Sequence, residues 1–100
     1  MTRGACMNVL VIGLGSMGKR RIRLMKEMYD NISIYGVDSR EDRRAEAGEV
    51  FGIACAESIE QAAEKFDIDA AFVCTAPLSH CAIITECLKR HWNVFTELNL

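Results

Sequence analysis

The sequence predicts an α/β protein in which a doubly wound parallel sheet is covered by helices on both faces, a three-layer α/β/α arrangement. Two observations predict it. Short unbroken apolar runs, typical of strands that are buried on both faces of a parallel sheet, recur along the chain. Longer segments of helical period lie between them, so that strands and helices alternate throughout. With 100 residues, the chain is expected to form one domain of about five strands and four helices.

The first half of the chain predicts three strands and two helices. Residues 9–12 are branched and apolar and predict the first strand, and a helical period begins at Met17. The β-branched and aromatic stretch at 32–37 predicts the second strand. A polar segment favours a helix over about residues 40–48, and residues 53–55 predict a short third strand. The spacing of Gly18, Ile22, Met25 and Tyr29 places these residues on one face of the first helix.

The second half predicts two helices and two strands. Ser58 and Gln61 have the spacing of a capping box, which begins a third helix. The apolar run at 70–75 predicts the fourth strand, and a proline ends it. A helix over about 79–91 and a strand at 94–96 complete the pattern. In the third helix, helical spacing relates Ile59, Ala62, Ala63 and Phe66. The last helix is expected to bury Ile83, Ile84, Cys87 and Leu88.

Composition excludes several classes of function. The formal net charge of −2 gives the chain no overall attraction to nucleic acid or to an anionic membrane. No apolar run approaches the ~18–20 residues that span a bilayer, and the N-terminus has no apolar signal core. The five cysteines include no C-x-x-C pair, which predicts reduced core thiols and neither a disulfide framework nor a metal site. The expected location is the cytoplasm, without nucleic-acid or membrane partners.

Three glycines lie where the first strand ends and the first helix begins. The motif G-L-G-S-M-G fits G-x-G-x-x-G, with a strand before it and a helix after it. Gly13 permits a tight turn, Gly15 lets a pyrophosphate approach the backbone, and Gly18 lets the helix pack close to the sheet. Free N–H groups and the positive end of the helix dipole stabilise the anion. The predicted phosphate-binding turn consists of Gly13, Leu14, Gly15, Ser16, Met17 and Gly18.

An acidic residue at the end of the second expected strand completes this dinucleotide-binding pattern. Asp38 follows Gly18 by about 20 residues, and its carboxylate can accept hydrogen bonds from both hydroxyls of the adenosine ribose. A carboxylate there repels a 2′-phosphate and favours NAD. Arg40 could stack on the adenine or reach a 2′-phosphate, which leaves NADP as the alternative. The predicted site also includes Ser39, which lies between these two residues.

Two other interpretations of the same residues stay open. The glycines could serve only a tight turn while Asp38 caps the next helix. The turn could instead bind S-adenosylmethionine, since proteins that bind it also use a glycine-rich turn and a later acid. The spacing of three glycines into a close-packed helix fits a pyrophosphate better.

Across residues 8–100 the sequence resembles the N-terminal half of the Gfo/Idh/MocA oxidoreductases, named for glucose–fructose oxidoreductase and inositol dehydrogenase. The resemblance rests on G-L-G-S-M-G, V-D-S-R, F-V-C-T-A-P-L-S-H and C-L-K-R-H-W-N-V-F-T-E-L-N-L. It implies a Rossmann fold and hydride transfer between C4 of a nicotinamide and a carbon of a sugar, polyol or similar substrate. The residues that it places near the nicotinamide half of the cofactor are Thr75, Ala76, Pro77, His80 and Glu97.

The sequence departs from this family where the family has Glu-Lys-Pro. Here the motif reads Glu97-Leu98-Asn99, and leucine cannot take the hydroxyl proton that an alcohol releases during hydride transfer. We therefore expect residues 1–100 to be an NAD(P)-binding fragment that lacks the C-terminal substrate domain and does not catalyse alone, with the catalytic residues unassigned. The alternative is a non-catalytic module that senses the dinucleotide. A homo-oligomer is a further expectation, because a missing domain would leave apolar surface exposed.

Overall fold

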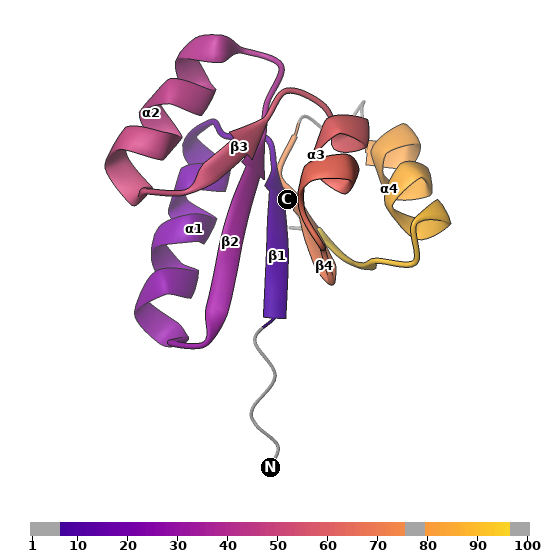
Figure 1. Cartoon of the computed structure of the whole chain (residues 1–100), viewed down its shortest axis with the longest axis horizontal. Helices are drawn as coiled ribbons and strands as arrows, with labels where there is room; N and C mark the ends of the chain where they lie inside the picture. The colour runs from indigo at the N-terminus through magenta and orange to yellow at the C-terminus, as the bar shows by residue number, and fades with distance from the viewer. Residues whose placement is uncertain (1–6, 76–79, 97–100) are drawn as a thin grey trace.

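The computed structural model describes residues 7–75 and 80–96 of the chain. In that part of the chain, strands and helices alternate in the predicted order, and five strands form one parallel sheet (Figure 1). The strands are β1 (Met7–Ile12), β2 (Ile32–Val37), β3 (Ala54–Ala56), β4 (Ala70–Val73) and β5 (Asn93–Thr96). The helices are α1 (Ser16–Met28), α2 (Glu41–Phe51), α3 (Ile59–Lys65) and α4 (His80–Lys89).

The sheet has the strand order β3-β2-β1-β4-β5, with β1 at its centre. Helices α1 and α2 cover one face, and α3 and α4 cover the other (Figure 1). The predicted doubly wound, three-layer architecture is therefore confirmed, and its strand order is that of a Rossmann fold. From β1 the chain first adds β2 and β3 on one side of the sheet and then adds β4 and β5 on the other side. In folds with such a change of side, a crevice for a ligand lies at the carboxyl ends of the strands where the change occurs, here β1 and β4.

The central strand shows why its sequence is an unbroken apolar run. Val9 and Val11 pack into the core beneath α1 and α2, whereas Leu10 and Ile12 pack into the core beneath α3 and α4. None of these four side chains is more than 3% exposed. Successive side chains of a strand point to opposite faces, so a strand covered on both faces needs apolar residues at every position.

The ends of several helices differ from the predicted bounds. Helix α1 stops at Met28, and Tyr29 is its C-cap with 51% of its surface exposed, so the prediction that Tyr29 continues the helical face of Ile22 and Met25 is wrong. Helix α2 continues to Phe51 because Gly52, with φ 67°, takes the left-handed conformation that closes a helix. On α4 the buried face is narrower than predicted, since Leu88 is 57% exposed.

The start of α3 matches the predicted capping box. The Ser58 hydroxyl accepts a hydrogen bond from the backbone N–H of Gln61 at 3.1 Å. The Gln61 side-chain oxygen accepts one from the backbone N–H of Glu57 at 2.9 Å, one residue before the usual partner. These two bonds fix the turn between β3 and α3 at the same edge of the sheet as the glycine turn.

Two features are absent from the residues that the structure describes. None of the helices in residues 7–75 and 80–96 combines the length and the apolar character that crossing a membrane requires. The same residues contain no group of three or more His, Cys, Asp or Glu side chains placed to hold a metal ion.

Candidate functional site

The first glycine of the motif is required by the backbone of the turn after β1. Gly13 has φ +97°, which side chains other than glycine rarely adopt, and its N–H donates to the Val37 carbonyl at 2.8 Å. A Cβ at this position would lie 2.9 Å from the Cys74 carbonyl oxygen. The turn from β1 therefore runs so close to the end of β4 that a side chain has no room.

The third glycine, Gly18, lets the first turn of α1 pack directly against the backbone of Gly13. A Cβ at Gly18 would overlap the Gly13 carbonyl oxygen, so even alanine would force the helix away from the turn. Leu14 lies between these two glycines and is fully buried, where it packs into the core beneath α1 and α2. Gly13 and Gly18 are thus explained by packing within the chain alone.

The second glycine has no such explanation. Gly15 is the N-cap of α1 with φ −79°, which every residue tolerates. A Cβ there would meet nothing closer than the Arg43 guanidinium, at the ordinary contact distance of 3.5 Å. Gly15 lines a cavity, at the start of a helix with no acidic residue in its first turn and no side-chain cap. Room beside a bare backbone at the positive end of a helix is what an anionic ligand needs.

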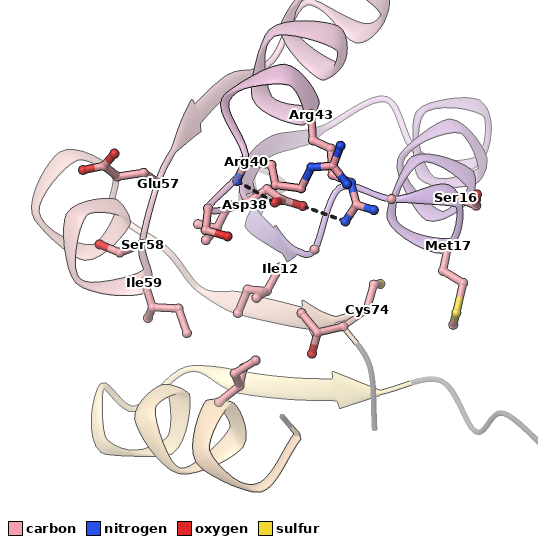
Figure 2. Close-up of a pocket in the computed structure, with 16 residues that line it drawn as sticks. Ile12, Ser16, Met17, Asp38, Arg40, Arg43, Glu57, Ser58, Ile59 and Cys74 are labelled. Carbon is pink, nitrogen blue, oxygen red and sulfur yellow. Dashed lines mark hydrogen bonds and ion pairs between the residues drawn. The ribbon is translucent and has the colours of Figure 1, made fainter. Parts of the chain in front are cut away.

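Asp38 follows β2 and lies beside the glycine turn (Figure 2). Among the residues that the structure describes, Asp38 is the one buried side chain that is polar or charged, and 8% of its surface is exposed. Its Oδ2 accepts a hydrogen bond from the Leu14 backbone N–H at 2.9 Å, and its Oδ1 accepts one from the Arg40 N–H at 2.9 Å. Because Arg40 is the N-cap of α2, Asp38 does not cap that helix. Its carboxylate instead joins the glycine turn to the end of β2.

The cation that the sequence singled out, Arg40, has its guanidinium paired with a neighbouring carboxylate. The Arg40 guanidinium donates two hydrogen bonds to the Asp42 carboxylate, at 3.1 and 2.7 Å. This pairing raises the pKa of Arg40 and lowers the pKa of Asp42. Arg43, which the sequence reasoning missed, also reaches the site, with its Nη1 3.5 Å from Asp38 Oδ2 (Figure 2). Its sequence signal was its place in the first turn of α2, at the same sheet edge as Asp38.

A cavity of about 670 Å³ joins these groups at the carboxyl ends of β1 to β4. Most of the predicted site residues line it: Gly13, Gly15, Ser16, Met17, Asp38, Ser39, Arg40 and Thr75. Leu14 and Gly18 do not line it and lie in the packing beneath it. His80 is the first residue of α4. Ala76, Pro77 and Glu97 lie outside the described residues.

The wall of the cavity also includes residues that sequence reasoning did not select. Glu57 and Ser58 come from the turn after β3, Ile59 is the first residue of α3, and Ile83 comes from α4. Cys74 lines the cavity just after β4, where burial raises the pKa of its thiol. A thiol with a raised pKa stays protonated at neutral pH, which makes Cys74 a poor nucleophile. The predicted parallel sheet alone could have indicated that the turn after β3 contributes to the site, because the carboxyl ends of all parallel strands lie at the same edge of the sheet.

The chain matches known oxidoreductases along nearly its whole length. Residues 7–98 match a family model described as an oxidoreductase family with an NAD-binding Rossmann fold. A curated relative, the myo-inositol 2-dehydrogenase of Thermotoga maritima, is 33% identical over 93 residues, which make up 91% of this chain and 28% of the relative. The chain therefore spans less than a third of that relative's length.

Solved structures share the fold at lower sequence identity. Apo scyllo-inositol dehydrogenase from Lactobacillus casei superposes with a TM-score of 0.87 at 19% identity, over 97% of this chain and 29% of that one. Scyllo-inositol dehydrogenase from the same organism, with bound NAD(H) and scyllo-inositol, superposes with a TM-score of 0.81 at 20% identity, over 90% of this chain and 27% of that one.

Proposed function

This chain belongs to the Gfo/Idh/MocA oxidoreductase family, as its NAD-binding Rossmann part, and from that premise we propose that residues 1–100 bind the dinucleotide for a longer oxidoreductase. The longer protein would move a hydride between the nicotinamide and a polyol, sugar or similar substrate. The proposed substrate class is supported by the curated relative, which is a myo-inositol 2-dehydrogenase. It is also supported by the fold shared with a dehydrogenase crystallised with scyllo-inositol.

One observation carries the proposal: the hydrogen bond of 2.9 Å between the Leu14 N–H and the Asp38 carboxylate. It brings the glycine turn and the acid to one cavity, with Gly15 and Asp38 both on its wall. Each carboxylate oxygen has a further lone pair with which to accept a ribose hydroxyl. The open backbone at Gly15 and the start of α1 supply N–H groups and a positive dipole end for a pyrophosphate. The residues present therefore fit an adenine dinucleotide.

We propose that NAD binds more tightly than NADP. The Asp38 carboxylate repels a 2′-phosphate on the ribose that it holds. Arg40 was the cation that could offset this repulsion, but its guanidinium is occupied by Asp42. NADP therefore meets an acid with less compensation at the position of its extra phosphate.

The bound nicotinamide would supply the hydride-transfer chemistry, and this chain's residues would bind and orient it. Thr75 lines the cavity at the end of β4, and Ala76, Pro77, His80 and Glu97 are proposed to complete that side. A hydroxyl substrate also needs a proton acceptor, and Leu98 stands where the family has its lysine. We therefore propose that residues 1–100 bind the dinucleotide without catalysing, and that a longer protein supplies the acceptor.

The second candidate function is a module that senses the dinucleotide without catalysis. Leu98 favours it, because it removes the family's proton carrier. The two functions differ in a protein that extends beyond residue 100. Formation of NADH from a polyol supports the enzyme, whereas cofactor binding without turnover supports the sensing module.

The setting of the chain is proposed from its thiols and its surface. Free Cys55, Cys74, Cys81 and Cys87 support a reducing compartment, the cytoplasm. Large apolar side chains such as Met28, Tyr29 and Phe95 are about half exposed or more, at 68%, 51% and 49%. Such surface supports self-association into a homo-oligomer. Neither a nucleic acid nor a membrane is proposed as a partner.

Calorimetric titration of the 100-residue chain with NAD, and separately with NADP, tests the proposed function. We expect saturable binding of both, with NAD tighter. An equal or greater affinity for NADP would contradict the role given to Asp38. Absence of binding to either cofactor would overturn the proposal for these residues. Formation of NADH on addition of NAD and myo-inositol would show that the chain does catalyse alone.

A further inference from the structure

Three arginines follow Asp38 closely, and the structure gives each of them a different role. Arg40 is held by Asp42 through two hydrogen bonds. Arg44 donates from Nη1 to the backbone carbonyls of Asp38 and Ser39, at 2.9 and 3.0 Å, and so ties α2 to the turn after β2. Arg40 and Arg43 both line the cavity, and of these two it is the Arg43 guanidinium that lies within contact distance of the glycine turn.

The position of Arg43 coincides with the space left open at Gly15. Its guanidinium carbon and Nη1 each lie 3.5 Å from the place that a Gly15 Cβ would occupy. Its Nη1 also lies 3.5 Å from Asp38 Oδ2, which is longer than a direct N–H···O hydrogen bond of about 2.7–3.2 Å. That carboxylate oxygen already accepts the Leu14 N–H. Arg43 is therefore only loosely paired and can turn its donors to a better acceptor.

We propose that Arg43 binds a phosphate of the dinucleotide at Gly15, exchanging its loose ion pair with Asp38 for hydrogen bonds to the phosphate oxygens. This inference rests on the proposed function. Guanidinium groups present a planar fork of donors that matches two phosphate oxygens at once, and such charge-assisted bonds are short and strong. The exchange would also leave Asp38 free to accept the ribose hydroxyls. Arg43 then serves the phosphate, while Asp38 serves the ribose.

The test compares ligands that share the adenosine but differ in phosphate. Adenosine, ADP, NAD and NADP would each be titrated against NADH bound to the chain, with displacement followed by NADH fluorescence. In Arg43→Ala we expect affinity for ADP and NAD to fall about tenfold, and affinity for adenosine to change less than about twofold. Arg43→Lys, which keeps the charge but loses the fork, is expected to lie between. The matched control is Arg23→Ala, which removes an exposed arginine of α1 that does not line the cavity.

Each other outcome overturns the inference in a different way. An equal loss for adenosine and ADP would mean that Arg43 contacts the nucleoside. A loss confined to NADP would mean that it serves the 2′-phosphate, and tighter binding would mean that it only obstructs the site. A larger loss of affinity in Arg40→Ala than in Arg43→Ala would mean that Arg40, and not Arg43, binds the phosphate. No binding of any ligand by the unsubstituted chain would overturn the proposed function itself, whereas binding without a phosphate-dependent loss overturns only this inference.

Discussion

Replacement of Gly15 by valine separates ligand binding from folding more sharply than any other change in the turn. The nearest atoms to a Cβ at this position belong to the flexible Arg43 side chain, 3.5 Å away, and the backbone φ of −79° suits valine. Loss of the glycine N-cap costs up to about 1 kcal/mol. A less flexible unfolded chain returns ~0.4–1 kcal/mol. The free energy of unfolding should therefore change by less than about 1 kcal/mol.

Binding should respond very differently to the same substitution. The valine methyl groups would stand in the cavity where a phosphate approaches the backbone N–H groups of α1. Hydrogen bonds to a charged group contribute ~1.5–3 kcal/mol each, so we expect at least a ~100-fold loss of NAD affinity, or about 2.7 kcal/mol. Calorimetric titration measures the affinity, and thermal unfolding followed by circular dichroism measures the stability.

Gly18→Ala is the matched control, because it adds a smaller side chain to the same motif. Its Cβ would overlap the Gly13 carbonyl oxygen, and such overpacking costs ~1–3 kcal/mol or more. We expect this smaller change to lower the unfolding temperature by several degrees, while the larger change at Gly15 leaves it nearly unaltered. If Gly15→Val binds NAD as tightly as the unsubstituted chain, or if it unfolds like Gly18→Ala, the assignment of the phosphate position is refuted.

Three further predictions concern the acid, a helix cap and a buried thiol. Asp38→Ala is expected to weaken NAD binding more than NADP binding, since it removes both the ribose acceptor and the charge that repels a 2′-phosphate; an unchanged affinity ratio in titrations would contradict this. Ser58→Ala removes the cap of α3 and should cost about 1 kcal/mol of unfolding free energy in denaturant titrations, with Ser58→Asp as the control that restores an acceptor. Burial raises the pKa of the Cys87 thiol from 9.0 to about 11, so the unfolded chain loses this proton first and the free energy of unfolding falls as pH rises through that interval. Urea titrations across that pH range should show a smaller decrease in Cys87→Ala.

The fold could be predicted because its determinants are local in the sequence. The apolar run of β1 reports burial on both faces, and the Ser58 cap reports the start of α3. The strand order is set by pairing between distant segments, such as β1 with β4, and the apolar pattern of each strand contains no record of its neighbour. The position of Tyr29 was predicted wrongly because the apolar spacing of the helix continues to Tyr29 in the sequence, whereas the helix itself ends at Met28.

The sequence predicted the parts of the candidate site that depend on the course of the backbone, but it did not predict which side chains pair with one another. Gly13, Gly15 and Asp38 are recognisable because their spacing follows from the strand, turn and helix that carry them. Asp42 pairs with the Arg40 guanidinium, whereas the Arg43 guanidinium lies near the glycine turn. Both arginines lie at the start of α2, so their separate roles depend on side-chain partners that spacing does not reveal.

The bond between the Leu14 N–H and Asp38 has a consequence for the length of ligand that the chain can select. It is a bond within the chain that joins two loops which follow different strands. The separation between Asp38, the proposed ribose acceptor, and the open backbone at Gly15 is therefore set during folding, and the entropy of fixing it is not lost again on association. A nucleotide whose ribose and phosphate match this separation engages both points at once. A nucleotide with a longer or shorter connection between its ribose and its phosphate engages only one of the two points. The site is therefore expected to select ligands by the distance between these groups as well as by their charge.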